Sequence, residues 1–142
     1  MNALLVIDIQ KEFVSEAIIK EVKDFIDKSN YNLVLGTIFE NRMDSNFTKF
    51  LHYYDCMKVK PELNCEIVKK STYGLDSTTI NRLKDYQVDV IGTDIDACVM
   101  AVCYQLFDAG INFKILTKYC YGSLKTEALE IMKRNFGKAV II

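Results

Sequence analysis

Three side chains that could act together in covalent catalysis lie far apart in the sequence. Cys98 is a potential nucleophile, Asp8 a potential base, and Lys69 or Lys70 a potential stabilising cation. A cysteine attacks as its thiolate, so it needs a base to take the thiol proton and a positive charge beside the sulfur. Each residue also has an ordinary explanation, as a small buried side chain, a loop cap or a solvated lysine. The chemistry therefore depends on whether the fold brings the three together.

The stretch around Cys98 is typical of a buried strand, a tight turn and a helix. Residues 88–91 form a β-branched run, Gly92 breaks it, and apolar residues then recur at helical spacing as far as Gly110, which suits a helix C-cap. This pattern places Cys98 in the first turn of the helix. Backbone N–H groups are unpaired there and the helix dipole favours an anion, so we expect a stabilised thiolate.

Apolar runs and amphipathic segments alternate along the chain. The expected strands cover residues 3–7, 33–39, 66–70, 88–92, 112–117 and 139–142. The expected helices cover residues 16–28, 74–84, 97–109 and 124–136, and a further one is capped at Asp44 or Ser45. Because no hairpin signal separates the strands, the sequence predicts an α/β fold with a three-layer, doubly wound (Rossmann-like) architecture. Its six-stranded parallel sheet has the order 3-2-1-4-5-6, with helices on both faces.

This topology places the candidate residues at one edge of the sheet. Asp8 ends the first strand, Lys69 or Lys70 ends the third, and Cys98 follows the fourth. The first and fourth strands are neighbours in the expected order, so Asp8 and Cys98 face one crevice. Ligands of doubly wound sheets bind in such a crevice, beyond the carboxyl ends of the strands.

Length and composition narrow the class of protein. The chain has 142 residues, of which half are hydrophobic and 26% charged, and this predicts one globular domain spanning residues 1–142. A formal net charge of −1 without a basic patch argues against nucleic acid or membrane as a partner. The absence of a signal peptide and the five cysteines without a CxxC pair favour a reducing cytoplasm. One histidine and no clustered ligands argue against a zinc site.

Three motifs resemble those of the isochorismatase-like cysteine hydrolase superfamily, which is related to nicotinamidases and isochorismatases. Residues 5–13 look like its opening motif, an apolar strand followed by Asp-x-Gln-x-x-Phe. Residues 68–73 are similar to its lysine motif, in which the lysine precedes a tyrosine by three positions, and this spacing selects Lys70 over Lys69. Residues 92–99 look like its nucleophile turn, with glycine six positions before the cysteine. The motifs occur in the family's order, and the resemblance spans the whole chain.

The resemblance implies a catalytic triad of Asp8 as base, Lys70 as stabilising cation and Cys98 as nucleophile. It also implies a cis peptide between Thr93 and Asp94, with the N–H groups of Asp94 and Cys98 forming an oxyanion hole. The implied reaction is hydrolysis of an amide C–N bond of a small molecule through a thioester. No cofactor is implied.

Two departures from the family's pattern bear on the chemistry. Residues 36–47 contain no histidine where nicotinamidases carry an Asp-x-His metal motif, so neither a metal site nor a metal-dependent nicotinamidase is expected. Asp94 stands where the family usually has a small residue. Its carboxylate either points away as a loop cap or raises the pKa of Cys98.

Substrate contacts are predicted at Phe13, Asn41 and Tyr73, which lie in or beside the matched motifs. For the other cysteines the sequence predicts no chemistry: Cys56, Cys65, Cys103 and Cys120. The resemblance and the aromatic helix faces favour a homo-oligomer, either a dimer or a tetramer, that acts on a small-molecule substrate.

Two other hypotheses are open. One is a family member that keeps the fold but has lost turnover and serves as a small-molecule-binding or assembly protein, a possibility that Asp94 supports. The other is a phosphorylation receiver domain. Such domains are also α/β and have a lysine after the fifth strand, for which Lys118 could stand. A receiver domain needs an acceptor aspartate after the third strand, however, and this chain has Lys70 there.

Overall fold

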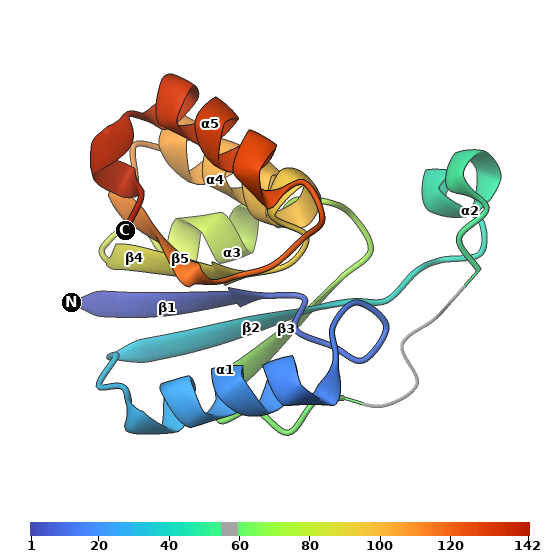
Figure 1. The fold of residues 1–142 in the computed structure, drawn as a ribbon, viewed down its shortest axis with the longest axis horizontal. Coiled ribbons are helices and arrows are strands. Elements are labelled where there is room, and N and C mark those ends of the chain that lie inside the picture. The colour runs from blue at the N-terminus through green and yellow to red at the C-terminus, as the bar shows by residue number, and fades with distance from the viewer. Residues whose placement is uncertain (55–59) are drawn as a thin grey trace.

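The computed structural model describes residues 1–54 and 60–142, which form a parallel sheet with helices on both faces (Figure 1). The strands are β1 (Asn2–Ile7), β2 (Leu33–Phe39), β3 (Glu66–Lys70), β4 (Gln87–Gly92) and β5 (Phe113–Cys120). The α-helices are α1 (Glu16–Lys28), α2 (Asn46–Leu51), α3 (Ser77–Arg82), α4 (Met100–Asp108) and α5 (Lys125–Phe136). A π-helical turn, Ile95–Val99, leads into α4. Cys56 lies outside the described residues.

Alternate residues of β1 belong to two separate layers of the core. Leu5 and Ile7 pack with the cluster that holds α3, α4 and α5, whereas Leu4 and Val6 pack with Val22 of α1. This alternation follows from the period of two in a strand, and β1 is buried on both faces because it lies in the centre of the sheet. The expected doubly wound arrangement, with helices on both faces, is therefore confirmed (Figure 1).

The sheet has five strands within the described chain, in the order β3-β2-β1-β4-β5, so the prediction of a sixth strand at residues 139–142 is wrong. Lys138–Val140 form a 3₁₀ turn after Gly137, whose φ is 92°. The turn includes the first half of the predicted strand. Only Ile141 makes a parallel bridge, to Ile115 of β5.

Local capping explains where the helices begin. The predicted bounds of α1 are confirmed, and the Ser15 hydroxyl accepts a hydrogen bond from the N–H of Ile18. Helix α3 is shorter than the predicted residues 74–84, because the Asp76 carboxylate caps it by accepting from the N–H of Thr79. No helix in the described parts of the chain has the length and apolar character needed to cross a bilayer.

Candidate active site

The predicted catalytic residues meet at the carboxyl edge of the sheet. Asp8 directly follows β1, Lys70 is the last residue of β3, and Cys98 lies in the π-helical turn after β4. Parallel pairing fixes this arrangement, because Lys70 is in register with Phe39 of β2 and Ile7 of β1 is in register with Gly92. The side chain of Lys70 crosses β2 to reach Asp8.

The Asp8 carboxylate is fully buried and has a different partner for each oxygen. The Thr37 hydroxyl donates to Oδ1 at 2.7 Å, and Nζ of Lys70 lies 2.8 Å from Oδ2. Thr37 also accepts from the Asp8 N–H, through its carbonyl at 3.2 Å and its hydroxyl at 3.1 Å. Within the described residues Oδ2 accepts no well-directed hydrogen bond, so it is the oxygen with capacity to take a proton.

The Lys70 ammonium lies between this carboxylate and the thiol. Its Nζ is 3.4 Å from Sγ of Cys98 and donates to the carbonyl oxygens of Thr72 at 2.7 Å and Tyr73 at 3.3 Å. Nζ also lies 5.3 Å from the centre of the Phe39 ring. The carbonyl groups and the aromatic face hold a buried cation in one position, which places positive charge beside both reacting groups.

The turn that presents Cys98 begins at Gly92, where the backbone has a φ of 136°. A Cβ atom at Gly92 would lie 2.2 Å from the carbonyl oxygen of Ile7, so only glycine lets β4 end this close to β1. The N–H of Thr93 donates to the same carbonyl at 3.0 Å. The peptide bond between Thr93 and Asp94 is cis, as the resemblance implied.

Burial raises the pKa of the Cys98 thiol to about 12, and the negative charge of Asp8 adds to this effect while Lys70 opposes it. The expectation of a resting thiolate at the helix start is therefore wrong. Loss of hydration disfavours the thiolate by more than the local dipole favours it. At neutral pH the resting site therefore holds Cys98 as a neutral thiol.

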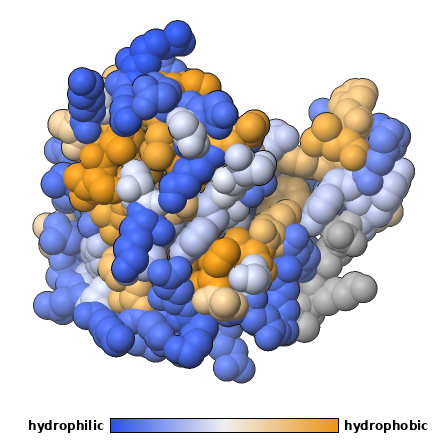
Figure 2. Space-filling view, viewed as in Figure 1, coloured by the Kyte–Doolittle hydropathy of each residue, from blue (hydrophilic) through white to orange (hydrophobic). Residues whose placement is uncertain are grey.

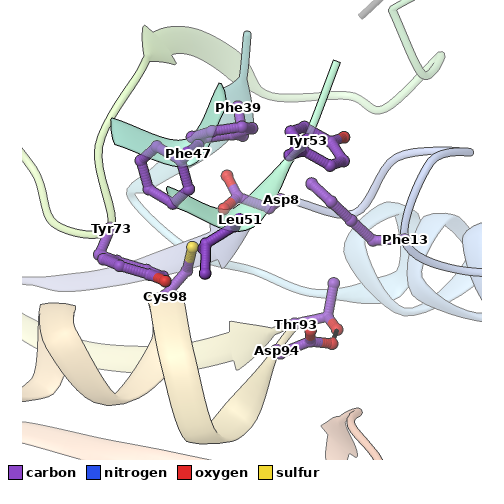
Figure 3. Close-up of a pocket in the computed structure, with 10 residues that line it drawn as sticks. All are labelled: Asp8, Phe13, Phe39, Phe47, Leu51, Tyr53, Tyr73, Thr93, Asp94 and Cys98. Atoms are coloured by element: carbon purple, nitrogen blue, oxygen red, sulfur yellow. Dashed lines mark hydrogen bonds between the residues drawn. The ribbon is translucent and has the colours of Figure 1, made fainter. Parts of the chain in front are cut away.

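The carboxylate of Asp94 neither caps the turn nor raises the pKa of Cys98, which were the two expectations for it. It stands at the N-cap position of the π-helical turn but makes no cap hydrogen bond, and it accepts instead from the hydroxyl of Thr93 at 2.6 Å. The causes that raise the pKa of Cys98 do not include it. Figure 3 shows Thr93 and Asp94 next to each other, apart from the Cys98 side chain.

A pocket of about 200 Å³ opens over Asp8 and Cys98 (Figure 3). Its apolar walls come from β2, α2, the segment just after α2, and the loops that follow β1 and β3: Phe13, Phe39, Phe47, Leu51, Tyr53 and Tyr73. Rings in this wall pack edge to face, with Phe47 4.9 Å from Phe39 and 4.8 Å from Tyr73 between ring centres. The structure thus places two of the predicted substrate-contact residues, Phe13 and Tyr73, in the pocket wall.

Asn41, the third predicted contact, does not line this pocket. Its buried side-chain amide donates to the Thr48 hydroxyl at 3.0 Å and to the Tyr53 carbonyl at 2.7 Å, and its oxygen accepts from the Ser45 hydroxyl. Asn41 therefore holds together the segment that carries α2 and the wall residue Tyr53. The structure thus gives Asn41 a positioning role, and its direct contact with substrate stays a prediction.

Two supporting residues were not predicted. One is Thr37, which orients Asp8 from the neighbouring strand. The other is Gln10, whose buried side chain donates to the Phe39 carbonyl and accepts from the Phe39 N–H, both at 2.9 Å. The Asp-x-Gln spacing of the first motif was the available signal for Gln10.

No group of three or more histidine, cysteine or carboxylate residues suited to a metal ion occurs in the described part of the chain. The four cysteines that the structure describes are free thiols: Cys65, Cys98, Cys103 and Cys120.

Solved structures match this chain in fold, whereas no protein-family model and no curated protein sequence matches it. An N-carbamoylsarcosine amidase from Thermoplasma acidophilum has a TM-score of 0.77 at 15% identity, over 96% of this chain and 94% of the amidase. An isochorismatase-like hydrolase from Alkaliphilus metalliredigens has a TM-score of 0.73 at 14% identity, over 94% and 91% of the two chains. A nicotinamidase from Staphylococcus aureus has a TM-score of 0.70 at 17% identity, over the full length of both. The chain therefore has the isochorismatase-like hydrolase fold.

Proposed function

We propose that this protein is a cysteine hydrolase that cleaves the amide C–N bond of a small molecule through a thioester intermediate. The observation that carries the proposal is the placement of one ammonium group, Nζ of Lys70, 2.8 Å from the Asp8 carboxylate and 3.4 Å from Sγ of Cys98. Asp8 and Cys98 line a pocket that admits a small molecule, and Lys70 contacts both of them. The amidase and nicotinamidase among the structural neighbours support the same reaction class.

In the first half of the reaction, Asp8 takes the thiol proton as Sγ of Cys98 attacks the amide carbonyl carbon. The high pKa of Cys98 suits this order, because the proton leaves only when the sulfur bonds to carbon and a free thiolate is not required. The carbonyl oxygen becomes an oxyanion, which the N–H groups of Asp94 and Cys98 receive in this proposal. The C–N bond then breaks, and Asp8 returns the proton to the departing nitrogen.

In the second half, Asp8 takes a proton from water as the water oxygen attacks the thioester carbon. The C–S bond breaks, the proton returns to the sulfur, and the carboxylic acid product leaves. Because Nζ of Lys70 contacts both Asp8 and Cys98, its charge offsets the negative charge on whichever of the two carries it. Its contacts to the carbonyls of Thr72 and Tyr73 keep it in place as that charge moves.

Amide turnover and adduct formation test the proposal together. Purified protein is incubated with primary and secondary amides, released ammonia or amine is measured, and acid-quenched samples are examined by intact mass for an acyl group. We expect product and an adduct on Cys98, and loss of both in Cys98→Ala. The matched control is Cys65→Ser, which removes a free thiol outside the pocket and should retain activity. A broad amide panel that yields neither product nor adduct would count against the proposal.

A second candidate function is binding without turnover, in which the same pocket holds a small molecule for transport, sensing or assembly. In that case Asp8 does not act as a base, and the Cys98 thiol, whose pKa is raised by burial, is a weak nucleophile. A binding protein would saturate with an amide, and Cys98→Ala would bind as tightly as the natural chain. The hydrolase differs by consuming the amide.

We further propose that the protein acts as a homo-oligomer in the cytoplasm. The free thiols support a reducing compartment, and the apolar side chains exposed on α4 and α5, such as Phe107 and Ile131, support self-association. Sedimentation velocity tests the oligomer directly. A single monomeric species across micromolar concentrations would contradict it.

A further inference from the structure

An apolar groove lies beside the catalytic pocket and is not used by the chemistry described above. Its volume is about 380 Å³, and it runs between α2 and the loop after β3. The groove is lined by Asn46, Phe47, Phe50, Leu51, Thr72 and Tyr73. Three of these residues, Phe47, Leu51 and Tyr73, also line the catalytic pocket, so the two hollows are adjacent and share a wall.

The walls of the groove are unusually exposed for apolar side chains. Phe50 is 73% exposed, Leu51 61% and Tyr73 45%. Helix α2 stands beyond the carboxyl edge of the sheet, away from the other helices (Figure 1), and Figure 2 shows hydrophobic residues on this projecting part across a hollow from the body. Contiguous exposed apolar surface beside a reactive site is typical of a ligand-binding groove.

We propose that the substrate of the proposed hydrolase carries an apolar alkyl or aryl arm that lies in this groove while its amide lies against Cys98. The inference rests on the proposed function for the placement of the amide. A pocket of about 200 Å³ accommodates the amide and a few further atoms, and the shared wall of Phe47, Leu51 and Tyr73 leads the remainder of the molecule into the groove. The substrate class is therefore amides of extended hydrophobic acids or amines.

The lining also determines which substrate arms should bind poorly. Its two polar residues, Asn46 and Thr72, are neutral, and no charged side chain lines it among the described residues. A charged arm would lose hydration without gaining an ion-pair partner. An alkyl or aryl arm buries apolar surface from both partners.

Binding to the full-length Cys98→Ala variant tests the arm without any need for turnover. Isothermal titration calorimetry would compare primary amides of straight-chain acids from two to eight carbons, and N-alkyl acetamides of the same lengths. Once the arm enters the groove, we expect affinity to rise about threefold to fourfold per added methylene in at least one series. The same slope should appear in kcat/KM of the natural chain.

Phe50→Ala, made in the same Cys98→Ala background, separates the groove from the catalytic pocket, because Phe50 lines only the groove. We expect affinity for the eight-carbon amide to fall about tenfold, the loss of about two buried methylenes. Affinity for acetamide should change less than twofold. The matched control is Phe107→Ala on α4, which is also exposed and lies outside both hollows, and it should leave both affinities unchanged.

Flat affinities across both series would overturn the proposal, as would an equal effect of Phe50→Ala and Phe107→Ala. A second copy of the chain is the alternative occupant. It would be identified by flat series together with a concentration-dependent dimer that Phe50→Ala dissociates, and this result also overturns the proposal. If the slope is present but the natural chain turns over no amide, the groove inference stands and the proposed function fails. If the natural chain turns over amides but affinity does not rise with arm length, the proposed function stands and the groove inference fails.

Discussion

The Asp8→Asn substitution should make Cys98 react faster with an alkylating reagent even though it removes the proposed base. The negative charge of Asp8 raises the pKa of the Cys98 thiol, whereas Lys70 lowers it. Asparagine has nearly the same size and removes only the charge. The Lys70 ammonium, 3.4 Å from Sγ, is then no longer balanced by a carboxylate 2.8 Å away.

The size of the effect follows from the charges. Asp8 and Cys98 both contact Nζ of Lys70, so their reacting atoms are at most about 6 Å apart, where two like charges repel by about 2.8 kcal/mol at an effective dielectric constant near 20. This repulsion corresponds to about two pKa units, and hence to about 100-fold more thiolate at pH 8. Since a thiolate of lower pKa is also a weaker nucleophile, we expect alkylation to accelerate about tenfold.

The assay is the rate of iodoacetamide labelling of the Cys98 peptide, followed by mass spectrometry from pH 6 to pH 10. Lys70→Met should have the opposite effect and slow the labelling. Asp94→Asn is the matched control, because its carboxylate also lines the pocket but does not shift the pKa of Cys98, and it should change the rate less than twofold. If Asp8→Asn slows labelling as Lys70→Met does, Asp8 promotes thiolate formation in the resting site and the reasoning from burial and charge is refuted.

Three further outcomes are expected. Thr37→Val removes the donor to Asp8 Oδ1 and should lower the free energy of unfolding in urea by about 1–2 kcal/mol and kcat/KM for an amide about tenfold. Gly92→Ala would place a Cβ atom against the Ile7 carbonyl at a residue whose φ is 136°. It should lower the free energy of unfolding, measured by thermal unfolding, by about 3 kcal/mol or more. A loss below about 1 kcal/mol would contradict the close packing. Because the folded pKa of Cys98 lies above its unfolded value, its contribution to stability is complete below about pH 9 and declines as pH rises towards 12. Cys98→Ala should therefore reduce the loss of stability between pH 8 and pH 10.5 by about 2 kcal/mol; an unchanged loss would contradict the raised pKa.

The convergence of Asp8 and Cys98 could be predicted because it depends on the topology of the sheet. Continuous apolar runs without hairpin signals determine parallel strands, and the carboxyl ends of parallel strands share one edge. The choice of Lys70 over Lys69 came from the motif spacing. In the structure Lys70 points into the site, while Lys69 pairs with Glu40 at the surface. Alternation along β3 places adjacent lysines on opposite faces, so one of the two had to point away.

The segment after β2 could not be predicted in the same way. It contains Asn41, Phe47 and Tyr53, and its shape depends on the side-chain contacts of Asn41 and on a helix of only six residues. Periodicity reports which residues of a regular element are buried, but it does not report how an irregular segment folds back on itself. For that reason Asn41 was predicted to touch substrate and Tyr53 was missed.

The pKa of Cys98 was mispredicted for a related reason. The sequence places the residue at a helix start, which favours a thiolate, but it gives no measure of how deeply the turn is buried. The burial of the turn depends on Gly92, because this residue allows β4 to end against the Ile7 carbonyl and so brings the turn close to β1. The buried position of the thiol is thus a consequence of strand packing several residues away.

Gln10 shows how a motif residue without chemistry of its own supports the site. Its side-chain amide pairs with both backbone groups of Phe39, so it continues the hydrogen bonding between β1 and β2 after Asp8 has left the strand geometry with a φ of 50°. This pairing holds the backbone of Phe39 in place, and Nζ of Lys70 lies 5.3 Å from the centre of the Phe39 ring. Gln10 and Asp8 therefore act on Lys70 from two sides, one through packing and one through charge. Gln10 stands two positions after Asp8 because the single residue between them, Ile9, points into the core.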